Sequence, residues 1–560
     1  MITTQQRLNQ FSNAFDTAAK FRCFSNLNNE GLASTKNAMM KALNNWCDRL
    51  SVLETFSGSN KFADPFSMIG GQVAEAAVKQ GMGVNFSNDL GGVNSTNIST
   101  LILGSYYQSY AMSYIAKLEG MTSPKTVYPI QQLRAYNDFG VYHKDDIVFD
   151  PRTSPYPAAQ LTGAQISNHV KDITGATLQD VDFAIPIRIN SVKMEIKETG
   201  KDEYIPVGFD RPDGYQKGKL YTTVGGATSI SIDYAKGKIK VEGATALNNV
   251  DAIRFTASYD STKDDTQAYV PTLYSGNDML ELNSMAHQFT LRQNLEDIVH
   301  MNKEYAYNKP AGVASSWAQN TVAQLMNFYV RSLDTNIMRT LVEPYLPYIT
   351  SITDDQTFNL AGWTSAGNMN LFEGRMQELF AHLDTTMANN TDGRRPTAII
   401  IDSVGAVNLM TNRHFKRQGA GMSSSDGFVG TLYNVPIIKS RVLDWYTKEE
   451  YKTLPNGTAN PYNIYDKLKA NLSFDTAAGE AVSVGFVVHK DPSNKEAAVI
   501  VGDYIVPYCT SSMPSNGATI VEHSILCEYA TKLMLDKLAI PIVIKVSSHP
   551  SFKTPDIAIY

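Results

Sequence analysis

Residues 310–344 read PAGVASSWAQNTVAQLMNFYVRSLDTNIMRTLVEP. Apolar residues recur along this stretch at spacings of three or four, which places them on one face of a helix. That face comprises Val322, Met326, Val330, Leu333, Ile337 and Leu341. Pro344 ends the helix because it lacks an amide N–H and clashes with the preceding turn. A helix of about thirty residues is roughly 45 Å long, which predicts a rod that spans a sheet or a neighbouring subunit.

The length and composition describe a folded protein with several domains. A chain of 560 residues exceeds what one hydrophobic core supports and predicts about two to four domains. Hydrophobic residues make up 43% and charged residues 19%, which excludes a disordered chain or an integral membrane protein. The formal net charge of −6 disfavours a dedicated nucleic-acid binder, which usually carries a basic stripe.

The four cysteines are too few and too scattered for a disulfide framework, and none belongs to a CxxC pair. We therefore expect no structural zinc and a reducing, cytoplasmic site of folding. The N-terminal residues MITTQQRLNQFSNAF contain no apolar segment of the kind found in secretory signals. No run approaches the roughly eighteen apolar residues of a membrane-spanning helix.

The first third of the chain predicts helices followed by extended segments. An amphipathic helix is expected at 32–53 and a second helix at 73–79. The Gly/Asn/Ser tract at 81–99 has little to bury, which favours an extended arm. A strand-like segment then begins at 126–142.

Alternation with a period of two dominates from 183 to 260, as in VKMEIKE (192–198) and SISIDYAKGKIKVEG (229–243). The residues from Asp233 to Gly237 predict a hairpin turn in which glycine supplies a positive φ. These strands predict a small inserted all-β domain. A strand at 278–291 and a short helix at 295–305 are expected to lead back to the long helix.

The second half of the chain mixes helices and strands. A helix is expected to bury Leu371, Met376, Leu379, Phe380, Leu383 and Met387. A buried strand at 398–401 precedes a helix that Asp402 or Ser403 can cap. Further strands are expected within 430–443, 481–490, 497–508 and 541–549, with a last helix at 526–537. The order predicts an α+β fold in two main layers plus an insertion.

The sequence offers no motif for catalysis, a cofactor or a metal. None of the nine histidines stands at a ligand spacing such as HExxH, and neither a GxSxG elbow nor a GxxxxGK[ST] loop occurs. The glycine-rich segment from Gly419 to Gly427 follows a helix and precedes a strand, the reverse of a nucleotide-binding loop. We therefore expect no catalytic residue, no cofactor and no metal site.

Several segments, taken in order, resemble the major capsid proteins of tailed double-stranded DNA bacteriophages with the HK97 fold, especially those of T4-like phages. AMSYIAKLEGMTSPKTVYPIQQLRAY (111–136) is similar to the junction of the N-terminal arm and the E-loop, and GTLYNVPIIKSRVLDW (430–445) to a strand of the axial domain. The β module stands where T4-like proteins carry an inserted domain, and the 311–343 helix where the family has its spine helix. Similar segments also lie at 394–410 and 497–512.

The resemblance implies an α+β fold of the HK97 type with an inserted small all-β domain. The implied parts are an N-terminal region and arm (1–110), an E-loop region (111–290) containing the inserted domain (about 185–262), a peripheral domain (291–394) with the spine helix (about 311–343), an axial domain (395–510) and a return to the peripheral domain (511–560).

The resemblance further implies a structural protein rather than an enzyme. Such a protein self-assembles into the hexamers and pentamers of an icosahedral head that encloses double-stranded DNA. The implied partners are other copies of the chain, portal, scaffold, and decoration or cement proteins, and the packaged DNA through weak, non-specific contacts. The implied location is the virion, after assembly in the host cytoplasm, without contact to a membrane.

Two other functions remain open. The chain can be another virion building block, such as a tail sheath or tube protein, which would form helical tubes. It can also be a cytoplasmic enzyme with a β module that binds carbohydrate or nucleotide. The enzyme requires a deep pocket with convergent polar groups within 395–510.

Overall fold

The computed structural model describes most of the chain. The described residues are 4–18, 26–56, 109–138, 142–152, 168–222, 229–243, 246–263, 272–294, 313–360, 369–391, 393–417, 426–474, 479–512 and 520–547. The helices expected at 73–79 and 295–305 and the arm expected at 81–99 lie outside these residues, as do the side chains of Val322 and Met326. None of the helices in the described ranges is long and apolar enough to cross a membrane.

The chain forms two units. The first comprises Met1–Tyr128, Leu280–Ala388 and Gly393–Tyr560, and the second comprises Pro129–Met279 and Asn389–Asp392. Helices and strands together fill the first unit, whereas the second consists mainly of strands. The described residues therefore have a mixed α+β fold with an additional β sheet.

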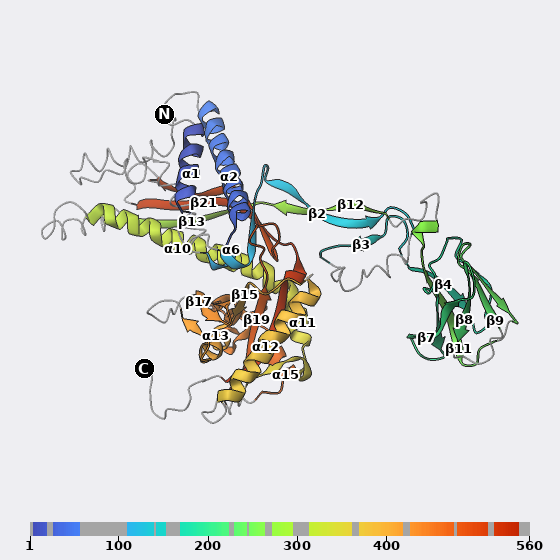
Figure 1. Cartoon of the computed structure of the whole chain (residues 1–560). Helices are drawn as coiled ribbons and strands as arrows, with labels where there is room; N and C mark the ends of the chain where they lie inside the picture. The colour runs from blue at the N-terminus through green and yellow to red at the C-terminus, as the bar shows by residue number, and fades with distance from the viewer. Residues whose placement is uncertain are drawn as a thin grey trace. The chain divides into compact units, whose positions relative to one another are not determined.

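The first unit contains a four-stranded sheet in the order β1-β20-β21-β13. Its strands are β1 (Ala116–Gly120), β20 (Val499–Ser512), β21 (Ile520–Leu533) and β13 (Met285–Asn294). β1 is parallel to β20, and the other neighbours are antiparallel. Figure 1 shows α1 (Thr4–Ala18) and α2 (Asn29–Phe56) on one face and α10 (Val313–Val342) along the other.

Helix α10 occupies nearly the residues expected from the apolar stripe. Val330, Leu333, Ile337 and Leu341 are each at most 6% exposed. The helix also makes polar contacts to β21, because Asn336 Nδ2 donates to the Tyr529 hydroxyl at 2.7 Å. It ends before the 3-10 turn Glu343–Tyr345, which contains Pro344.

The helix predicted at 526–537 is wrong, because these residues belong to β21 and to a 3-10 turn at Asp536–Leu538. β21 is an inner strand that pairs with β20 on one edge and β13 on the other. Hydrogen bonding to a neighbouring strand on both edges outweighs the helix propensity of the residues in this segment. Ile525, Cys527 and Tyr529 are buried at a spacing of two, which is the strand pattern.

A seven-stranded sheet with the order β14-β22-β19-β15-β18-β17-β16 is the second sheet of this unit. Its strands are β14 (Phe358–Asn359), β22 (Ala539–Ser547), β19 (Glu480–Val488), β15 (Ala398–Ile401), β18 (Val435–Lys439), β17 (Gly427–Leu432) and β16 (Lys416–Arg417). The accompanying helices are α11 (Leu346–Ser351), α12 (Met369–Asn390), α13 (Ser403–Met410), α14 (Arg441–Thr447) and α15 (Tyr465–Asn471). Met376, Leu379, Leu383 and Met387 of α12 are buried in one cluster with β15, as expected, and Phe380 packs against it.

Two of the expected strands need correction. The single strand predicted at 278–291 is two strands, β12 (Leu273–Asn283) and β13, which join different sheets. The strand predicted within 430–443 is the β17–β18 hairpin followed by α14. β20 pairs with β1 in the four-stranded sheet, and β22 pairs with β19 in the seven-stranded sheet.

The second unit is built on an eight-stranded sheet in the order β4-β11-β6-β7-β8-β9-β10-β5. Its strands are β4 (Asn168–Thr174), β5 (Val181–Asp182), β6 (Lys193–Glu198), β7 (Tyr204–Pro212), β8 (Lys217–Thr222), β9 (Ser229–Asp233), β10 (Lys238–Glu242) and β11 (Val250–Ser258). β4 and β5 precede residue 185, so the sheet begins earlier than expected. The β9–β10 turn is present, and Gly237 adopts a φ of 65°. Glycine is also required there because a Cβ would lie 2.0 Å from the Ile185 carbonyl oxygen.

A three-stranded sheet in the order β12-β2-β3 carries the chain across the boundary between the units. Its other strands are β2 (Lys125–Ala135) and β3 (Ile147–Phe149). β2 and β12 are each 11 residues long, and each connects the two units along the chain. We call these two strands the ribbon.

Candidate functional site

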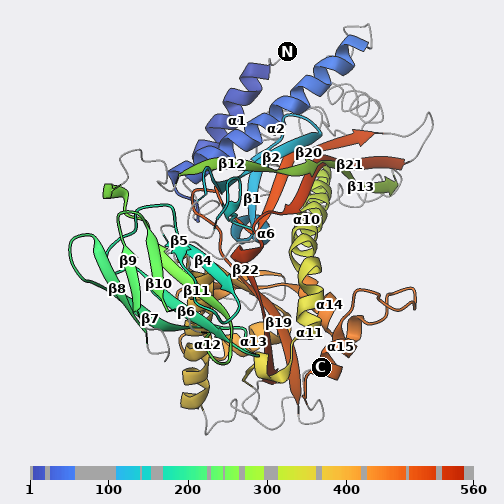
Figure 2. The same cartoon turned by 90° about the vertical axis from the view of Figure 1, so that its right-hand side faces the viewer.

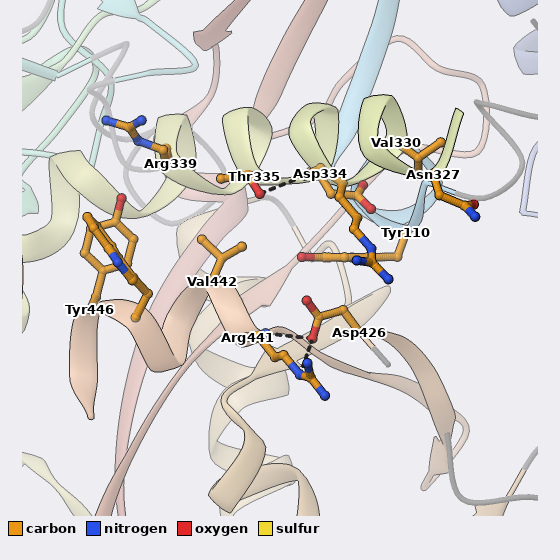
Figure 3. Close-up of a pocket in the computed structure, with 12 residues that line it drawn as sticks. Tyr110, Asn327, Val330, Asp334, Thr335, Arg339, Asp426, Arg441, Val442 and Tyr446 are labelled. Carbon is orange, nitrogen blue, oxygen red and sulfur yellow. Dashed lines mark hydrogen bonds and ion pairs between the residues drawn. The ribbon is translucent and has the colours of Figure 1, made fainter. Parts of the chain in front are cut away.

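A cavity of about 620 Å³ lies in the first unit between α10 and α14. Figure 3 shows it with Asp334 and Tyr110 near Asp426 at one end and Arg339 and Tyr446 at the other. Its lining residues are Tyr110, Asn327, Val330, Arg331, Asp334, Thr335, Arg339, Asp426, Arg441, Val442, Trp445 and Tyr446. The lining therefore joins α10, the short helix α6 (Tyr110–Tyr114) and α14.

Asp334 occupies the buried side of the cavity and is 6% exposed. One carboxylate oxygen, Oδ1, accepts hydrogen bonds from Ser109 Oγ at 2.5 Å and from the Ala111 amide at 3.1 Å. Ser109 is also the N-cap of α6, because its Oγ accepts the Met112 amide. Burial raises the pKa of Asp334 to about 7. This carboxyl group therefore fastens α6 to the middle of α10.

A second carboxyl group, Asp426, lies at the opposite wall. It accepts the Arg441 amide at 2.9 Å, and the Arg441 guanidinium lies 3.8 Å away. Burial raises the pKa of Asp426 above its ordinary value despite the arginine. Tyr110 reaches the same wall, since its hydroxyl lies 2.8 Å from Ser440 Oγ. Elements more than 300 residues apart in the sequence thus share one hydrogen-bonded wall.

At the other end of the cavity, two lining residues donate hydrogen bonds to Oε1 of Glu343. Arg339 Nε donates at 3.1 Å and the Tyr446 hydroxyl at 3.2 Å. Burial raises the pKa of Tyr446 well above its usual range, so the phenol stays a neutral donor. These contacts hold the end of α10 to α14.

The chemistry of the cavity is that of a structural joint. Asp334, Asp426 and Glu343 each accept hydrogen bonds from the protein itself. The described residues contain no group of three or more His, Cys, Asp or Glu side chains able to hold a metal. The signal for this site was weak in the sequence, because its residues come from three separate segments without a motif.

The structure confirms that Asp402 caps α13, and the carboxylate has further partners. Its Oδ1 accepts the Gly405 amide at 2.8 Å and Ser483 Oγ at 2.6 Å. Lys448 Nζ lies 2.6 Å from the other oxygen. The carboxylate at the end of β15 is therefore occupied by a cap and an ion pair.

The ribbon forms a second candidate site, of a different kind. The cluster in the three-stranded sheet consists of Ala135 and Val148 with Tyr142 packed against it. Large apolar side chains remain exposed along the strands, with Val127 at 42% and Met279 at 67%. Apolar side chains that are exposed to solvent along these strands present a surface suited to contact with another chain.

A polar network fixes the inner face of the same sheet. Asp150 is 3% exposed and accepts Gln132 Nε2 at 2.7 Å and the Arg152 guanidinium at 3.0 Å. Arg152 also donates to Asp278 of β12. Desolvation opposes ionisation of Asp150, but the hydrogen bonds from Arg152 outweigh it and lower the pKa. The pairing of β2, β3 and β12 thus includes a buried ionic tie.

Comparison with known proteins gives distant structural similarities only. No protein-family model and no curated protein matches the chain. The icosahedrally averaged capsid of the jumbo bacteriophage PhiKZ is 10% identical over 79% of this chain and 93% of that chain, with a TM-score of 0.34. The head of Helicobacter pylori bacteriophage KHP40 is 12% identical over 51% of this chain and 79% of that chain, with a TM-score of 0.30. The SrpI encapsulin complex of Synechococcus elongatus PCC 7942 is 9% identical over 51% of this chain and 81% of that chain, with a TM-score of 0.26.

Proposed function

We propose that the chain is a major capsid protein that assembles into hexamers and pentamers of an icosahedral phage head around double-stranded DNA. The ordered resemblance of the segments between 111 and 512 to capsid proteins supports this proposal. The family's arm, E-loop, peripheral, axial and inserted parts then correspond to the ranges given above. The role is structural, with neither a catalytic residue nor a cofactor.

The ribbon is the observation that carries the proposal. Val127 and Met279 are large apolar residues that are 42% and 67% exposed in the described chain. A neighbouring subunit that covers these side chains would bury apolar area worth about 25 cal/mol per Å². Repetition of one such contact around a ring gives closed five- and six-fold assemblies.

The proposed role of α10 follows from its buried face. As a spine helix it would hold the four-stranded sheet rigid while contacts form at the ribbon. Val322, Met326, Val330, Leu333, Ile337 and Leu341 are the residues that we assign to this face. The proposed partners are other copies, portal, scaffold and cement proteins, and packaged DNA through non-specific contacts. The proposed location is the virion.

Electron microscopy of the purified full chain tests the proposal. We expect closed shells or rings with five- and six-fold symmetry. Helical tubes would instead favour a sheath or tube protein. A persistently monomeric chain would contradict the proposal, and a small molecule bound in the cavity of such a monomer would favour the enzyme.

A further inference from the structure

The outward face of the eight-stranded sheet in the second unit carries an organised set of aromatic and basic side chains. Met194 and Ile196 of β6, Leu220 of β8 and Ile232 of β9 are buried in the core of the unit. Because side chains alternate along a strand, their sequence neighbours point to the other face. Figure 2 shows these strands side by side in the second unit.

Two exposed aromatic residues lie side by side on this face. In the strand register, Lys193 of β6 pairs with Phe209 of β7, and Phe209 pairs with Tyr221 of β8. Directly opposed residues have Cβ atoms about 5 Å apart, so the two side chains leave neighbouring positions on the same face of the sheet. Phe209 is 55% exposed and Tyr221 57%. A phenylalanine so exposed in the middle of a sheet is a platform without a partner in the described chain.

Basic side chains flank the two rings. Two residues further along β7, Arg211 pairs with Lys219 of β8, and the row continues through β9 to Lys240 of β10. Lys219 is paired with Asp213 at 2.6 Å, and the Arg211 guanidinium lies 5.2 Å from the centre of the Tyr221 ring. Among the described residues, Lys193, Arg211 and Lys240 have no carboxylate in ion-pair distance.

The combination of exposed aromatic rings and basic side chains indicates which kind of ligand this face can bind. Flat rings without hydrogen-bonding atoms, such as Phe209, bind apolar ring faces, and cations around them bind negative charges. A polysaccharide that contains uronate residues has both properties, since its sugar rings have apolar C–H faces and carry carboxylates. A single-stranded nucleic acid also combines flat rings with negative charges, so its binding is the competing outcome in the test below.

We propose that Lys193, Phe209, Arg211, Lys219, Tyr221 and Lys240 form a binding face for an acidic polysaccharide. Sugar rings lie on Phe209 and Tyr221, and uronate carboxylates pair with the lysines and Arg211. This binding is independent of shell formation, so it can be measured whether or not the chain assembles.

Affinity electrophoresis of the full chain in gels that contain alginate, a uronate polymer, tests the proposal. We expect alginate to retard the protein and neutral dextran to leave its mobility unchanged. Phe209→Ala should weaken retardation about ten-fold, and the double variant Lys193→Ala with Arg211→Ala should weaken it by a similar factor. Salt at about 0.5 M should release the polymer, since the ionic contacts are exposed to solvent.

Matched controls separate this face from general surface effects. Tyr215→Ser removes an aromatic residue that is 87% exposed in the turn between β7 and β8, and Lys236→Ala removes a lysine from the β9–β10 turn. Both should retain full alginate binding. Equal loss in the controls, absence of alginate binding by the unchanged protein, or tighter binding of single-stranded poly(dT) than of alginate would overturn the proposal.

Discussion

At the scale of single residues, Asp334 is a buried group of the first unit whose protonation is expected to affect stability. Burial raises its pKa from 3.8 to about 7, so the folded state binds this proton more tightly than the unfolded state. Its stabilising effect is fully present below about pH 4 and is lost as the pH rises through 7. We expect Asp334→Asn to reduce this dependence, because an amide oxygen can still accept both Ser109 Oγ and the Ala111 amide.

Denaturant unfolding at pH 5 and pH 8 measures this effect. The difference between the two pH values should shrink in Asp334→Asn and remain in the control Asp355→Asn, which changes an exposed carboxylate. Asp334→Ala should lose about 1–3 kcal/mol at both values, since two donors are left without an acceptor. An unchanged pH dependence in Asp334→Asn would contradict the assignment.

The stability that Arg152 contributes is expected to depend on pH in the opposite direction. Its hydrogen bonds lower the pKa of Asp150 below 3.8, so their contribution is present above that value and is lost as the pH falls through the lowered pKa. Arg152→Met leaves the buried carboxylate without its cation and should destabilise the three-stranded sheet by about 1–3 kcal/mol. Hydrogen exchange in β2 and β3 should rise at pH 7, whereas the exposed-loop control Lys144→Met should match the unchanged protein.

At the scale of elements, α10 can be tested through its buried face. Leu333→Asp or Ile337→Asp places a charge among apolar side chains and should prevent shell formation. Leu333→Ala should cost about 2–5 kcal/mol through cavity formation. Phe328→Asp places the same charge at a position of this helix that is 58% exposed and lies outside the cavity lining, and it serves as the control. Normal particles from Ile337→Asp would refute the proposed role of this face.

Substitutions in the ribbon are expected to affect assembly but not the stability of the single chain. Met279→Asp and Val127→Asp alter exposed side chains, so the unfolding free energy of the single chain should change by less than about 0.5 kcal/mol. Assembly should nevertheless fail, because a neighbouring copy would have to bury the new charge. The control Gln377→Glu adds a charge at an exposed position of α12, outside the ribbon. Assembly of both ribbon variants with unchanged yield would argue against a neighbour at this surface.

The sequence predicted correctly those elements whose structure is determined by residues close together in the chain. The stripe in α10, the turn at Gly237 and the cap at Asp402 each depend on residues a few positions apart. β21 depends instead on pairing with two other strands. β13 precedes it by more than 200 residues, and β20 precedes it directly. The alternation of Ile525, Cys527 and Tyr529 was its only local signal.

At the scale of the whole molecule, the joint between α10 and α14 was beyond sequence reasoning. Tyr110, Asp334 and Asp426 come together only because the chain returns to the same place three times. The aromatic and basic face had the same difficulty, since strand register alone brings Lys193, Phe209 and Tyr221 into one row.

The most direct test of the central claim is a cryo-electron microscopy reconstruction of particles assembled from the purified full chain. The capsid proposal predicts closed shells with five- and six-fold rings, in which strands Lys125–Ala135 and Leu273–Asn283 contact a neighbouring copy. Monomers under all assembly conditions, or helical tubes in place of closed shells, would contradict it.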